Sequence, residues 1–219
     1  IGAGESFSGI VDLISMKALR YDMKTLGKTV TAEEIPADMV EKAKEYRQKM
    51  VESAAEQDDA LMEKFFAGEE LTVDEIKKAI RKGCIARTIT PAFCGSAFKD
   101  KGVQQLLDGV CDYLPSPLDA GPAVSADDPS QKREPSDAEP FCGLAFKIMN
   151  DPKSGGKITF VRVYSGTLKL GAELLDSTIN REQRISRLFR MHAAKQEPLD
   201  EAHAGDIVAC VGLTETRTG

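Results

Sequence analysis

The sequence predicts a multidomain α+β protein, in which an α/β part is followed by a small antiparallel β-barrel. Three observations lead to this fold class. Capped helical segments dominate residues 36–114, a proline-rich stretch covers residues 115–140, and strands of alternating polarity with glycine turns begin at residue 141. The change from a helical to an alternating hydrophobic period indicates that a second domain begins there.

The first 30 residues predict short strands, because the apolar run at 9–14 lies among turn residues. Three helices follow. The first runs over about 36–57 and has proline at a favoured first position, and the second runs over 59–67 and ends at a glycine. The third begins with a capping box from Thr72 to Glu75 and is expected to stop at Gly83.

Residues 84–93 predict a strand, because β-branched side chains gather there. A Gly-Ser-Ala turn then leads into a helix. The apolar residues of this helix are spaced as one stripe, which predicts that the stripe faces a core. The residues of the stripe are Val103, Leu106, Leu107, Val110 and Leu114.

Residues 115–140 contain six of the ten prolines and many charges, which is typical of a linker or a long surface loop. Many short strands with glycine turns follow, and these favour a small barrel. The expected strands cover 141–149, 157–164, 168–170, 173–176, 184–191 and 206–213. The stretch 184–191 also fits a helical turn, and we interpret it as a strand.

The formal net charge of −6 conceals an uneven distribution. Residues 1–83 carry 13 basic and 17 acidic side chains, whereas residues 145–195 carry 10 and 4. This segregation is expected of two partners of different charge, or of solvated charges that cluster by chance.

Composition excludes several classes of protein. No apolar run approaches the roughly 18 residues of a membrane span, and the N-terminus lacks the regions of a signal peptide. The five scattered cysteines form no disulfide framework, and with two histidines they offer no zinc motif. We therefore expect a cytoplasmic protein without a metal. The absence of an initiator Met and a C-terminus without a closing element indicate an internal fragment of a longer chain.

One motif imitates a phosphate-binding loop. Gly27-Lys28-Thr29 has its final residues, but the motif requires glycine at the position of Asp22, and poor helix formers follow it. A hairpin turn is expected instead. No nucleophile elbow, zinc-protease motif or Asn-Lys-x-Asp motif occurs, and the acidic pairs at 58–59 and 127–128 lack a partner base. The sequence therefore predicts no catalytic residue.

Several segments resemble the bacterial elongation factor G family, the ribosomal translocases. "CGSAFKDKGVQQLLDGVCDYLPSPLD" is similar to the last nucleotide-binding motif and closing helix of that family's GTPase domain. "EPFCGLAFKIMNDP", "GKITFVRVYSGTLKLG", "RISRLFRMHA" and "AGDIVACVGL" resemble its second domain. "IGAGESFSGIVDLISMKALRY" and "IPADMVEKAKEYRQKMVESAAEQDDALMEKFFAGEELT" resemble its G′ insertion, which most other translational GTPases lack. The resemblance covers nearly the whole chain and is weakest over 124–139.

The resemblance implies four regions. Residues 1–83 would form the α/β G′ insertion, and 84–117 would form the last strand and helix of the GTPase domain. Residues 118–140 would be a linker or surface loop, and 141–219 would be the β-barrel domain II, incomplete at its C-terminus.

The resemblance also implies three sets of site residues. Backbone groups of Ser96, Ala97 and Phe98 would contact the guanine base in the parent, where only small side chains let the backbone approach. The exposed glutamates Glu41, Glu45 and Glu52 would contact the stalk protein of the large ribosomal subunit. Domain II would contact small-subunit ribosomal RNA through Arg162, Arg184, Arg187 and Arg190. Because few aromatic residues lie among these cations, we expect contacts to the RNA backbone and no base stacking.

The parent would couple GTP hydrolysis to the movement of tRNA and mRNA through the ribosome, using GTP and Mg²⁺. This chain lacks the phosphate loop, the switches and the metal ligands, so we expect no cofactor and no GTP hydrolysis in it. A stand-alone module that binds the ribosome or RNA remains an alternative, as do a tetracycline-protection or release-type GTPase and a GTP-independent RNA-binding barrel. No membrane or DNA partner is expected. The unpaired strand at 85–93 makes self-association of the chain an expected property.

Overall fold

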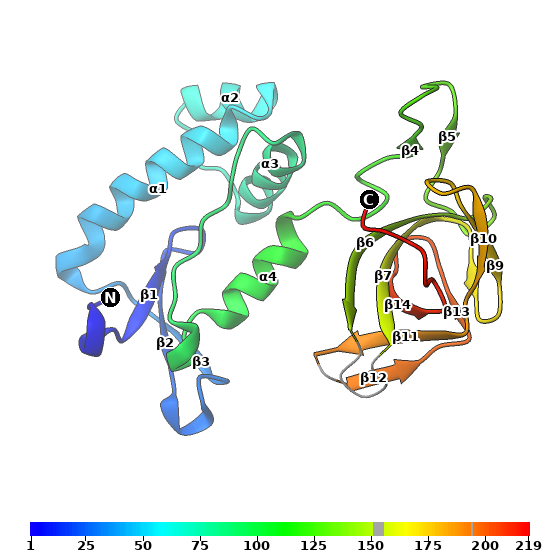
Figure 1. Ribbon diagram of the computed structural model, residues 1–219. Helices are drawn as coiled ribbons and strands as arrows, with labels where there is room; N and C mark the ends of the chain where they lie inside the picture. The colour runs from blue at the N-terminus through cyan, green and yellow to red at the C-terminus, as the bar shows by residue number, and fades with distance from the viewer. Residues whose placement is uncertain (151–155, 194) are drawn as a thin grey trace. The chain divides into compact units, whose positions relative to one another are not determined.

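The chain forms two compact units in a computed structural model that describes residues 1–150, 156–193 and 195–219 (Figure 1). The first unit is Ile1–Pro115 and the second is Ser116–Gly219. Asp151 and Pro152, which end one segment that resembles domain II, lie outside the described residues. No helix of the described ranges is long and apolar enough to cross a membrane.

The first unit begins with a three-stranded antiparallel sheet, as the sequence predicts. The strands β1 (Gly9–Asp12), β2 (Lys17–Tyr21) and β3 (Val30–Glu33) lie in that order. The imitation phosphate loop lies in the β2–β3 connection. There the Asp22 amide donates to the Thr29 carbonyl over 3.0 Å, and Gly27 has a φ of +70°. The expected hairpin turn is therefore confirmed.

Helices occupy the rest of the first unit. Their bounds are η3 (Ala37–Met39), α1 (Val40–Ala55), α2 (Asp59–Phe66), α3 (Val73–Ala86), η4 (Ala97–Lys99) and α4 (Val103–Tyr113); short 3₁₀ turns η1 (Gly4–Ser6) and η2 (Met23–Thr25) flank the strands. The capping box of α3 is confirmed. The Glu75 amide donates to the Thr72 hydroxyl over 3.3 Å, and the Glu75 carboxylate accepts from the Thr72 amide over 2.9 Å.

We expected α3 to end at Gly83. Instead, Gly83 lies buried inside the helix. The helix continues to Ala86 and ends where Arg87 adopts a left-handed conformation with φ of +62°. A Cβ at position 83 would lie 2.9 Å from Ile89 Cδ1 and 3.0 Å from Gln57 Cγ. Gly83 therefore serves close packing of these two side chains against the helix.

The expected strand over 84–93 is also wrong. Residues 84–86 belong to α3, and residues 89–95 form neither helix nor strand. A strand needs a hydrogen-bonded neighbour, and in the described part of the chain only the isolated Ser96–Lys101 bridge occurs near this segment. β-branched composition favours a strand only where a partner strand is available.

The core of the first unit lies between the helices. Its buried members are Ala54, Ala55, Leu71, Ile76, Ala79, Ile80 and Tyr113. Helix α4 contributes Tyr113, and its Asp112 carboxylate accepts from Lys77 of α3 over 2.8 Å.

The apolar stripe of α4 does not face this core, contrary to expectation. Leu106, Leu107, Val110 and Leu114 are between 45% and 60% exposed. The buried side of α4 carries Gly109 and Tyr113: Tyr113 packs into this core, and Gly109 lies against the Phe93 ring. Periodicity identifies an apolar face correctly, but it does not say that the same unit covers that face. We call these four residues the α4 stripe.

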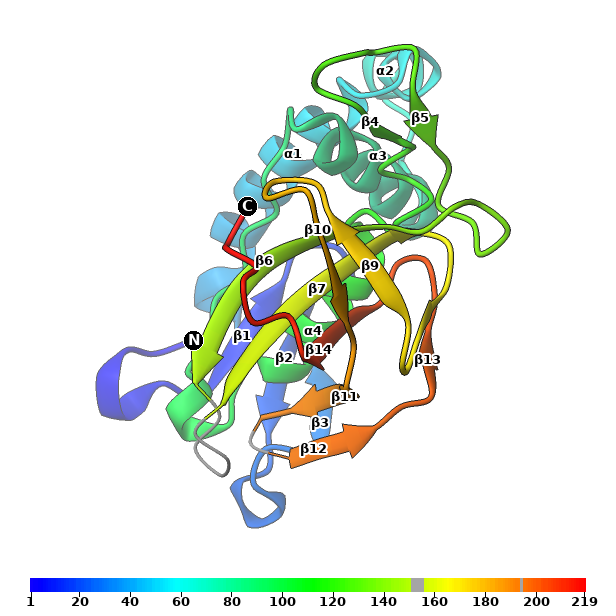
Figure 2. The same ribbon diagram turned by 45° about the vertical axis from the view of Figure 1, so that its right-hand side comes forward.

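The second unit is built on a five-stranded antiparallel sheet in the order β12-β11-β14-β7-β6 (Figure 2). Its strands are β6 (Cys142–Asn150), β7 (Lys157–Ser165), β11 (Arg187–His192), β12 (Lys195–Pro198) and β14 (Ile207–Val211). Three two-stranded pairs accompany it: β4 (Ala123–Val124) with β5 (Lys132–Arg133), β8 (Leu168–Lys169) with β13 (Glu201–Ala202), and β9 (Glu173–Asp176) with β10 (Arg181–Arg184).

The strands of the second unit enclose a core without forming a closed barrel. In the described ranges the five-stranded sheet ends at β12 and at β6, and the small pairs hydrogen-bond separately. The stretch 184–191, expected as one strand, is divided between β10 and β11 by Ile185 and Ser186. Because Ile185 is fully buried with Val163 and Leu188, the core holds the strands together where no continuous ladder does.

The segment expected as a linker belongs to the second unit. It contains the β4–β5 hairpin, and hydrogen bonds join its last residues, 136–140, to the end of β7 and the turn after it. The Ser165 hydroxyl donates to the Pro140 carbonyl over 2.7 Å, and the Gly166 amide donates to the Ser136 carbonyl over 2.9 Å. The Asp137 carboxylate accepts from the Ala204 amide over 2.9 Å.

Candidate functional site

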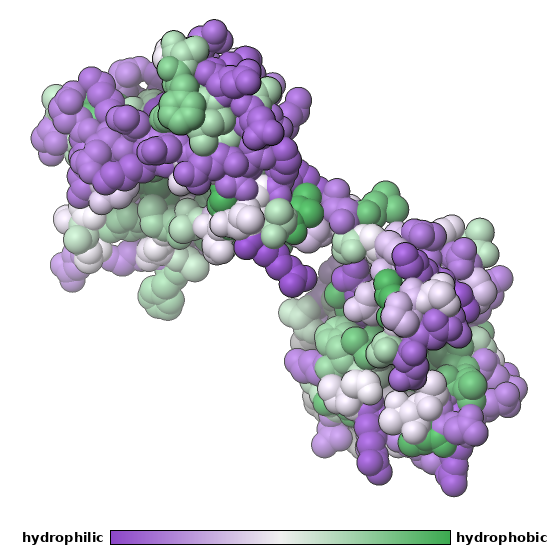
Figure 3. Space-filling model, turned by 90° about the horizontal axis from the view of Figure 1, so that it is seen from above, coloured by the Kyte–Doolittle hydropathy of each residue, from purple (hydrophilic) through white to green (hydrophobic). Residues whose placement is uncertain are grey.

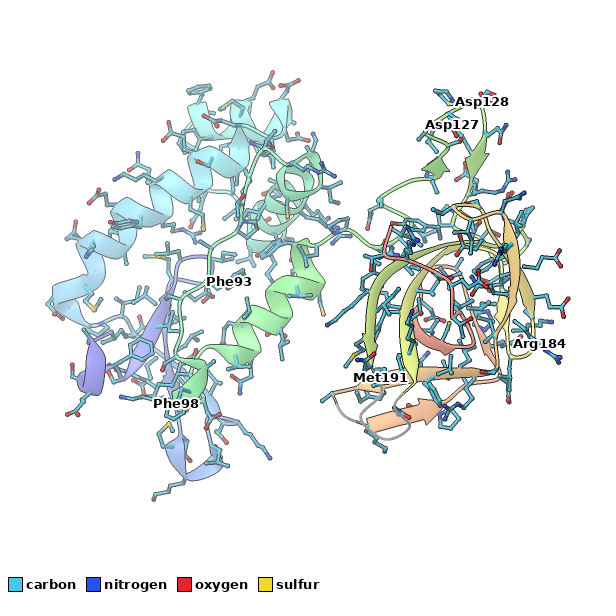
Figure 4. The ribbon with its side chains drawn as sticks, viewed as in Figure 1. Phe93, Phe98, Asp127, Asp128, Arg184 and Met191 are labelled. Atoms are coloured by element: carbon cyan, nitrogen blue, oxygen red, sulfur yellow. The ribbon has the colours of Figure 1, made fainter. Side chains whose placement is uncertain are left out.

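The turn at Ser96, Ala97 and Phe98 is well defined and open to solvent. Two backbone hydrogen bonds of 2.9 and 3.0 Å join Ser96 to Lys101. Asp100 has a φ of +51° and Gly102 a φ of +80°, which turn the chain into α4. The Phe98 side chain is fully exposed and points outward, whereas Phe93 lies further up the same segment (Figure 4).

A small hollow lies against this turn. It has a volume of about 210 Å³ and is lined by Phe93, Cys94, Gly95, Ala97, Lys101, Gly102, Val103 and Leu106. Pockets for drug-sized ligands usually measure about 300–1,000 Å³. The backbone at Gly102 lies close to the backbone at Cys94. A Cβ at Gly102 would lie only 2.8 Å from the Cys94 carbonyl oxygen. The turn can therefore contact the edge of a flat ligand, but it encloses only part of one.

The three predicted glutamates all lie exposed on α1, but their charges are largely paired. Glu41 accepts from Lys44 over 2.9 Å, and Glu45 accepts from Lys49 over 2.6 Å. The hydrogen bond and charge of Lys49 lower the pKa of Glu45 below its usual value. Glu52 has no such lysine in the described part of the chain. Helix α1 as a whole carries three glutamates and four basic residues, so it is not an acidic surface.

The four predicted arginines do not form one patch. Strand register places Arg162 and Arg187 on one side of the five-stranded sheet, opposite the core residues Val161 and Leu188. This outward side is partly covered, because Phe189 and Ala209 are 7% and 0% exposed in a second buried cluster. Arg190 has the opposite parity, and its guanidinium lies 3.9 Å from the Asp206 carboxylate.

Arg184 ends β10 and borders a separate hollow (Figure 4). This hollow has a volume of about 410 Å³, and its lining is Leu170, Gly171, Arg184, Ile185 and Ser186. It is shallow and contains one charged side chain, so it lacks the converging polar groups of a built ligand site.

The outward sheet face brings cations and aromatic rings together, which the sequence analysis missed. The rings of Phe160, Tyr164 and Phe189 each carry a cation over them, at 5.8 Å for Lys147, 5.4 Å for Arg162 and 5.7 Å for Arg187. We call these six residues the cationic sheet face. Of the three rings, Phe189 is 7% exposed and belongs to a buried cluster with Ile158 and Ala209, so the expectation of no base stacking stays a prediction. The alternation Phe160, Arg162, Tyr164 was a signal for these contacts, because residues two apart share a face.

Among the residues that the structure describes, the other titratable groups offer no catalytic arrangement. The acidic pair Asp127-Asp128 lies at the tip of the β4–β5 hairpin (Figure 4), where hydrogen bonds from Ser130 lower the pKa of Asp128. Burial raises the pKa of the Cys210 thiol to about 12, so it is not a nucleophile. In the described ranges no three His, Cys, Asp or Glu side chains are arranged to hold a metal ion.

Comparisons with known proteins bear on both units. Residues 156–219 match the model of the family described as elongation factor Tu domain 2. The crystal structure of ttk003000868 from Thermus thermophilus is similar over 100% of this chain, with 26% identity and a TM-score of 0.73. The two matches support a translational GTPase family. This chain covers 30% of that Thermus protein.

The match to elongation factor Tu domain 2 divides the candidate residues. All four arginines and most of the cationic sheet face lie inside the segment that matches elongation factor Tu domain 2. The glutamates of α1 and the turn at 96–98 lie outside it, and only the similarity to the Thermus structure covers them.

Proposed function

We propose that this chain is a segment of a translocase of the elongation factor G type, which moves tRNA and mRNA through the ribosome with the hydrolysis of GTP. One observation carries the proposal. A translation-factor domain 2 follows directly on an α/β unit in one chain, and both units together are similar to a single longer protein. That order agrees with the resemblance of residues 1–83 to the G′ insertion.

In this proposal the turn at Ser96, Ala97 and Phe98 contacts the guanine base of GTP through its backbone. The small hollow beside the turn and the close backbone approach at Gly102 support such a contact. The phosphates and Mg²⁺ would be held by parts of the parent outside this chain, so the chain alone would neither bind nor hydrolyse GTP.

Two ribosome contacts belong to the same proposal. Arg162 and Arg187 would meet ribosomal RNA of the small subunit, since they share the outward side of the five-stranded sheet. Helix α1 would meet the stalk protein of the large subunit, with Glu52 as the least neutralised of its three glutamates. A ribosomal role would place the protein in the cytoplasm.

Co-sedimentation with purified bacterial ribosomes tests the proposal. We expect the 219-residue chain to pellet with ribosomes at low salt, to be released as salt rises, and to be displaced by full-length elongation factor G. Calorimetric titration with GDP should detect no binding. Failure to pellet at low salt, or GDP binding in the micromolar range, would contradict the proposal. Pelleting without displacement would favour the alternative of a stand-alone ribosome-binding module.

A further inference from the structure

The turn that leads into α4 is bound to the N-terminal part of the first unit. It lies beside the three-stranded sheet, at the opposite end of the unit from α2 (Figure 1). Mostly hydrophilic residues cover the helical side of the unit, which Figure 3 shows from above. On the strand side, Lys101 donates to the Phe7 carbonyl and lies 5.6 Å from the centroid of the Phe7 ring. Lys99 donates to the Gly4 carbonyl over 3.3 Å. Two side chains of the turn therefore bind the segment that precedes β1.

The β2–β3 connection meets the same turn through its backbone. Gly27 has a φ of +70°, and a Cβ there would lie 1.9 Å from the Asp100 carbonyl oxygen. Only a residue without a Cβ lets the two backbones lie in contact. The side-chain amide of Gln104, in the first turn of α4, donates to the Gly27 carbonyl over 2.7 Å. The segment that imitates a phosphate loop is therefore fixed against the turn and against α4.

Gln104 makes this contact at the expense of its own second polar atom. Its Oε1 atom is buried and has no hydrogen-bond donor among the described residues. A buried acceptor without a donor destabilises a fold. Gln104 is therefore poorly suited to a purely stabilising role, and its useful contribution is the donor that it offers to the Gly27 carbonyl.

We infer that Gln104 and Gly27 are positioning residues for the turn at 96–98, and that the three-stranded sheet holds the turn through them. The inference rests on the proposed function, in which backbone groups of this turn contact the guanine base. A backbone contact tolerates little displacement, because a hydrogen bond weakens steeply when its donor is misdirected and no side chain is there to adjust. A shift of the β2–β3 connection therefore changes the geometry of the base contact.

A purely stabilising role leads to a different expectation. Loss of the contact would then loosen the whole first unit, whereas a positioning role confines the effect to the turn. Three turn amides report on the turn, because Ser96, Asp100 and Lys101 donate to carbonyls within it over 2.9, 3.1 and 3.0 Å. The amides of Ala79 and Ile80 in the buried core report on the unit as a whole.

Amide hydrogen exchange, measured by NMR on the 219-residue chain, tests the inference. Gln104→Glu keeps the size of the side chain and removes the donor. We expect the three turn amides to exchange about tenfold faster and the amides of Ala79 and Ile80 to change less than about twofold. Gln104→Met removes the donor without adding a charge. It is expected to give the same local effect, and it provides the test if the carboxylate prevents folding.

Gln105→Glu is the matched control, because it repeats the chemical change at the next residue. The Gln105 side chain accepts from the Tyr21 hydroxyl over 2.8 Å, and a carboxylate accepts equally well. The turn amides of this variant are expected to exchange as in the unchanged chain. Gly27→Ala should also speed exchange at the turn. Combined with Gln104→Met it should add less than the sum of the two effects, because both changes act on one contact.

Three results would overturn the inference. The turn amides could exchange normally in both Gln104 variants, or the core amides could accelerate as much as those of the turn. Gln105→Glu could loosen the turn as strongly as Gln104→Glu. Fully additive effects of Gly27→Ala and Gln104→Met would likewise refute a shared role. None of these measurements uses ribosomes or a nucleotide, so failure of this inference is distinguishable from failure of the proposed function.

Discussion

The α4 stripe and the cationic sheet face both lie away from the main core of their unit, but they differ in how far their apolar groups are covered. The stripe consists of aliphatic residues only, and its exposed side chains reach 60% exposure at Leu107. The sheet face sets aromatic rings under cations. The four residues of the stripe are all at least 45% exposed, whereas Phe189 is 7% exposed and packs with Ile158 and Ala209 in a second buried cluster. The difference teaches that the outward side of a strand can be covered while the apolar stripe of a helix stays open, so period alone identifies neither.

The largest expected effect comes from the buried side of the sheet. Leu188 lies one residue from both Arg187 and Phe189, points the other way, and is 2% exposed. Leu188→Ala is expected to lower the free energy of unfolding of the second unit by about 2–5 kcal/mol, through lost burial and the cavity left behind. Urea unfolding followed by circular dichroism measures it. A loss below about 0.5 kcal/mol would mean that the two faces are assigned the wrong way round.

A smaller effect on stability is expected at Gly83 of α3, the helix against which α4 packs. In an open helical position Gly→Ala gains up to about 1 kcal/mol. At Gly83 the new Cβ would lie within 3.0 Å of both Ile89 and Gln57, so Gly83→Ala is expected to destabilise the first unit by about 1 kcal/mol instead. Thermal unfolding gives the sign, and a rise in the melting temperature would refute this account of the glycine.

The first unit is expected to lose stability at low pH through Glu75. Hydrogen bonds from Lys64 and Thr72 lower the pKa of Glu75 from 4.5 to about 2. Its stabilising contribution is complete above the unfolded pKa and is lost as pH falls from about 4.5 to about 2, because the unfolded chain binds the proton first. Urea midpoints measured across this range should fall less steeply in Glu75→Gln, which keeps an acceptor for the helix cap. An identical slope in both chains would show that other carboxylates govern the acid response.

The smallest effect is expected on the α4 stripe itself. Because Leu107 is 60% exposed, Leu107→Ser should change the stability of the first unit by less than about 0.5 kcal/mol. A loss comparable to that of Leu188→Ala would remove the distinction between a covered face and an open one. Chemical denaturation of the two variants side by side decides this.

Helix ends and turns were predicted correctly where a few neighbouring residues determine them. The capping box at Thr72, the glycine stop after α2 and the hairpin in place of a phosphate loop follow from neighbouring residues, and all three were predictable. The failures involve partners distant in the sequence. Residues 89–95 have the composition of a strand without a strand beside them, and the α4 stripe has the period of a core helix without a core against it.

The candidate sites divide in the same way. Helical spacing predicts that Glu41, Glu45 and Glu52 are exposed. The pairing of Glu41 with Lys44 and of Glu45 with Lys49 depends on side-chain geometry, which the spacing of the glutamates does not show. The arginines were recognised as a basic set, yet only register could separate Arg162 and Arg187 from Arg190. Lys147 and Phe160 lie 13 positions apart in the sequence and meet only because β6 pairs with β7.

The buried thiol in β14 has a practical use. Cys94 and Cys111 are exposed, whereas Cys210 is fully buried and has a pKa raised to about 12 by burial. A maleimide at neutral pH therefore labels Cys94 and Cys111 first and the partly exposed Cys142 more slowly, while Cys210, almost never a thiolate, stays unmodified. Modification of Cys210 over time would report how often the core of the second unit opens. The rate of this modification therefore measures local unfolding of the core that Cys210 shares with Leu188 and Val163.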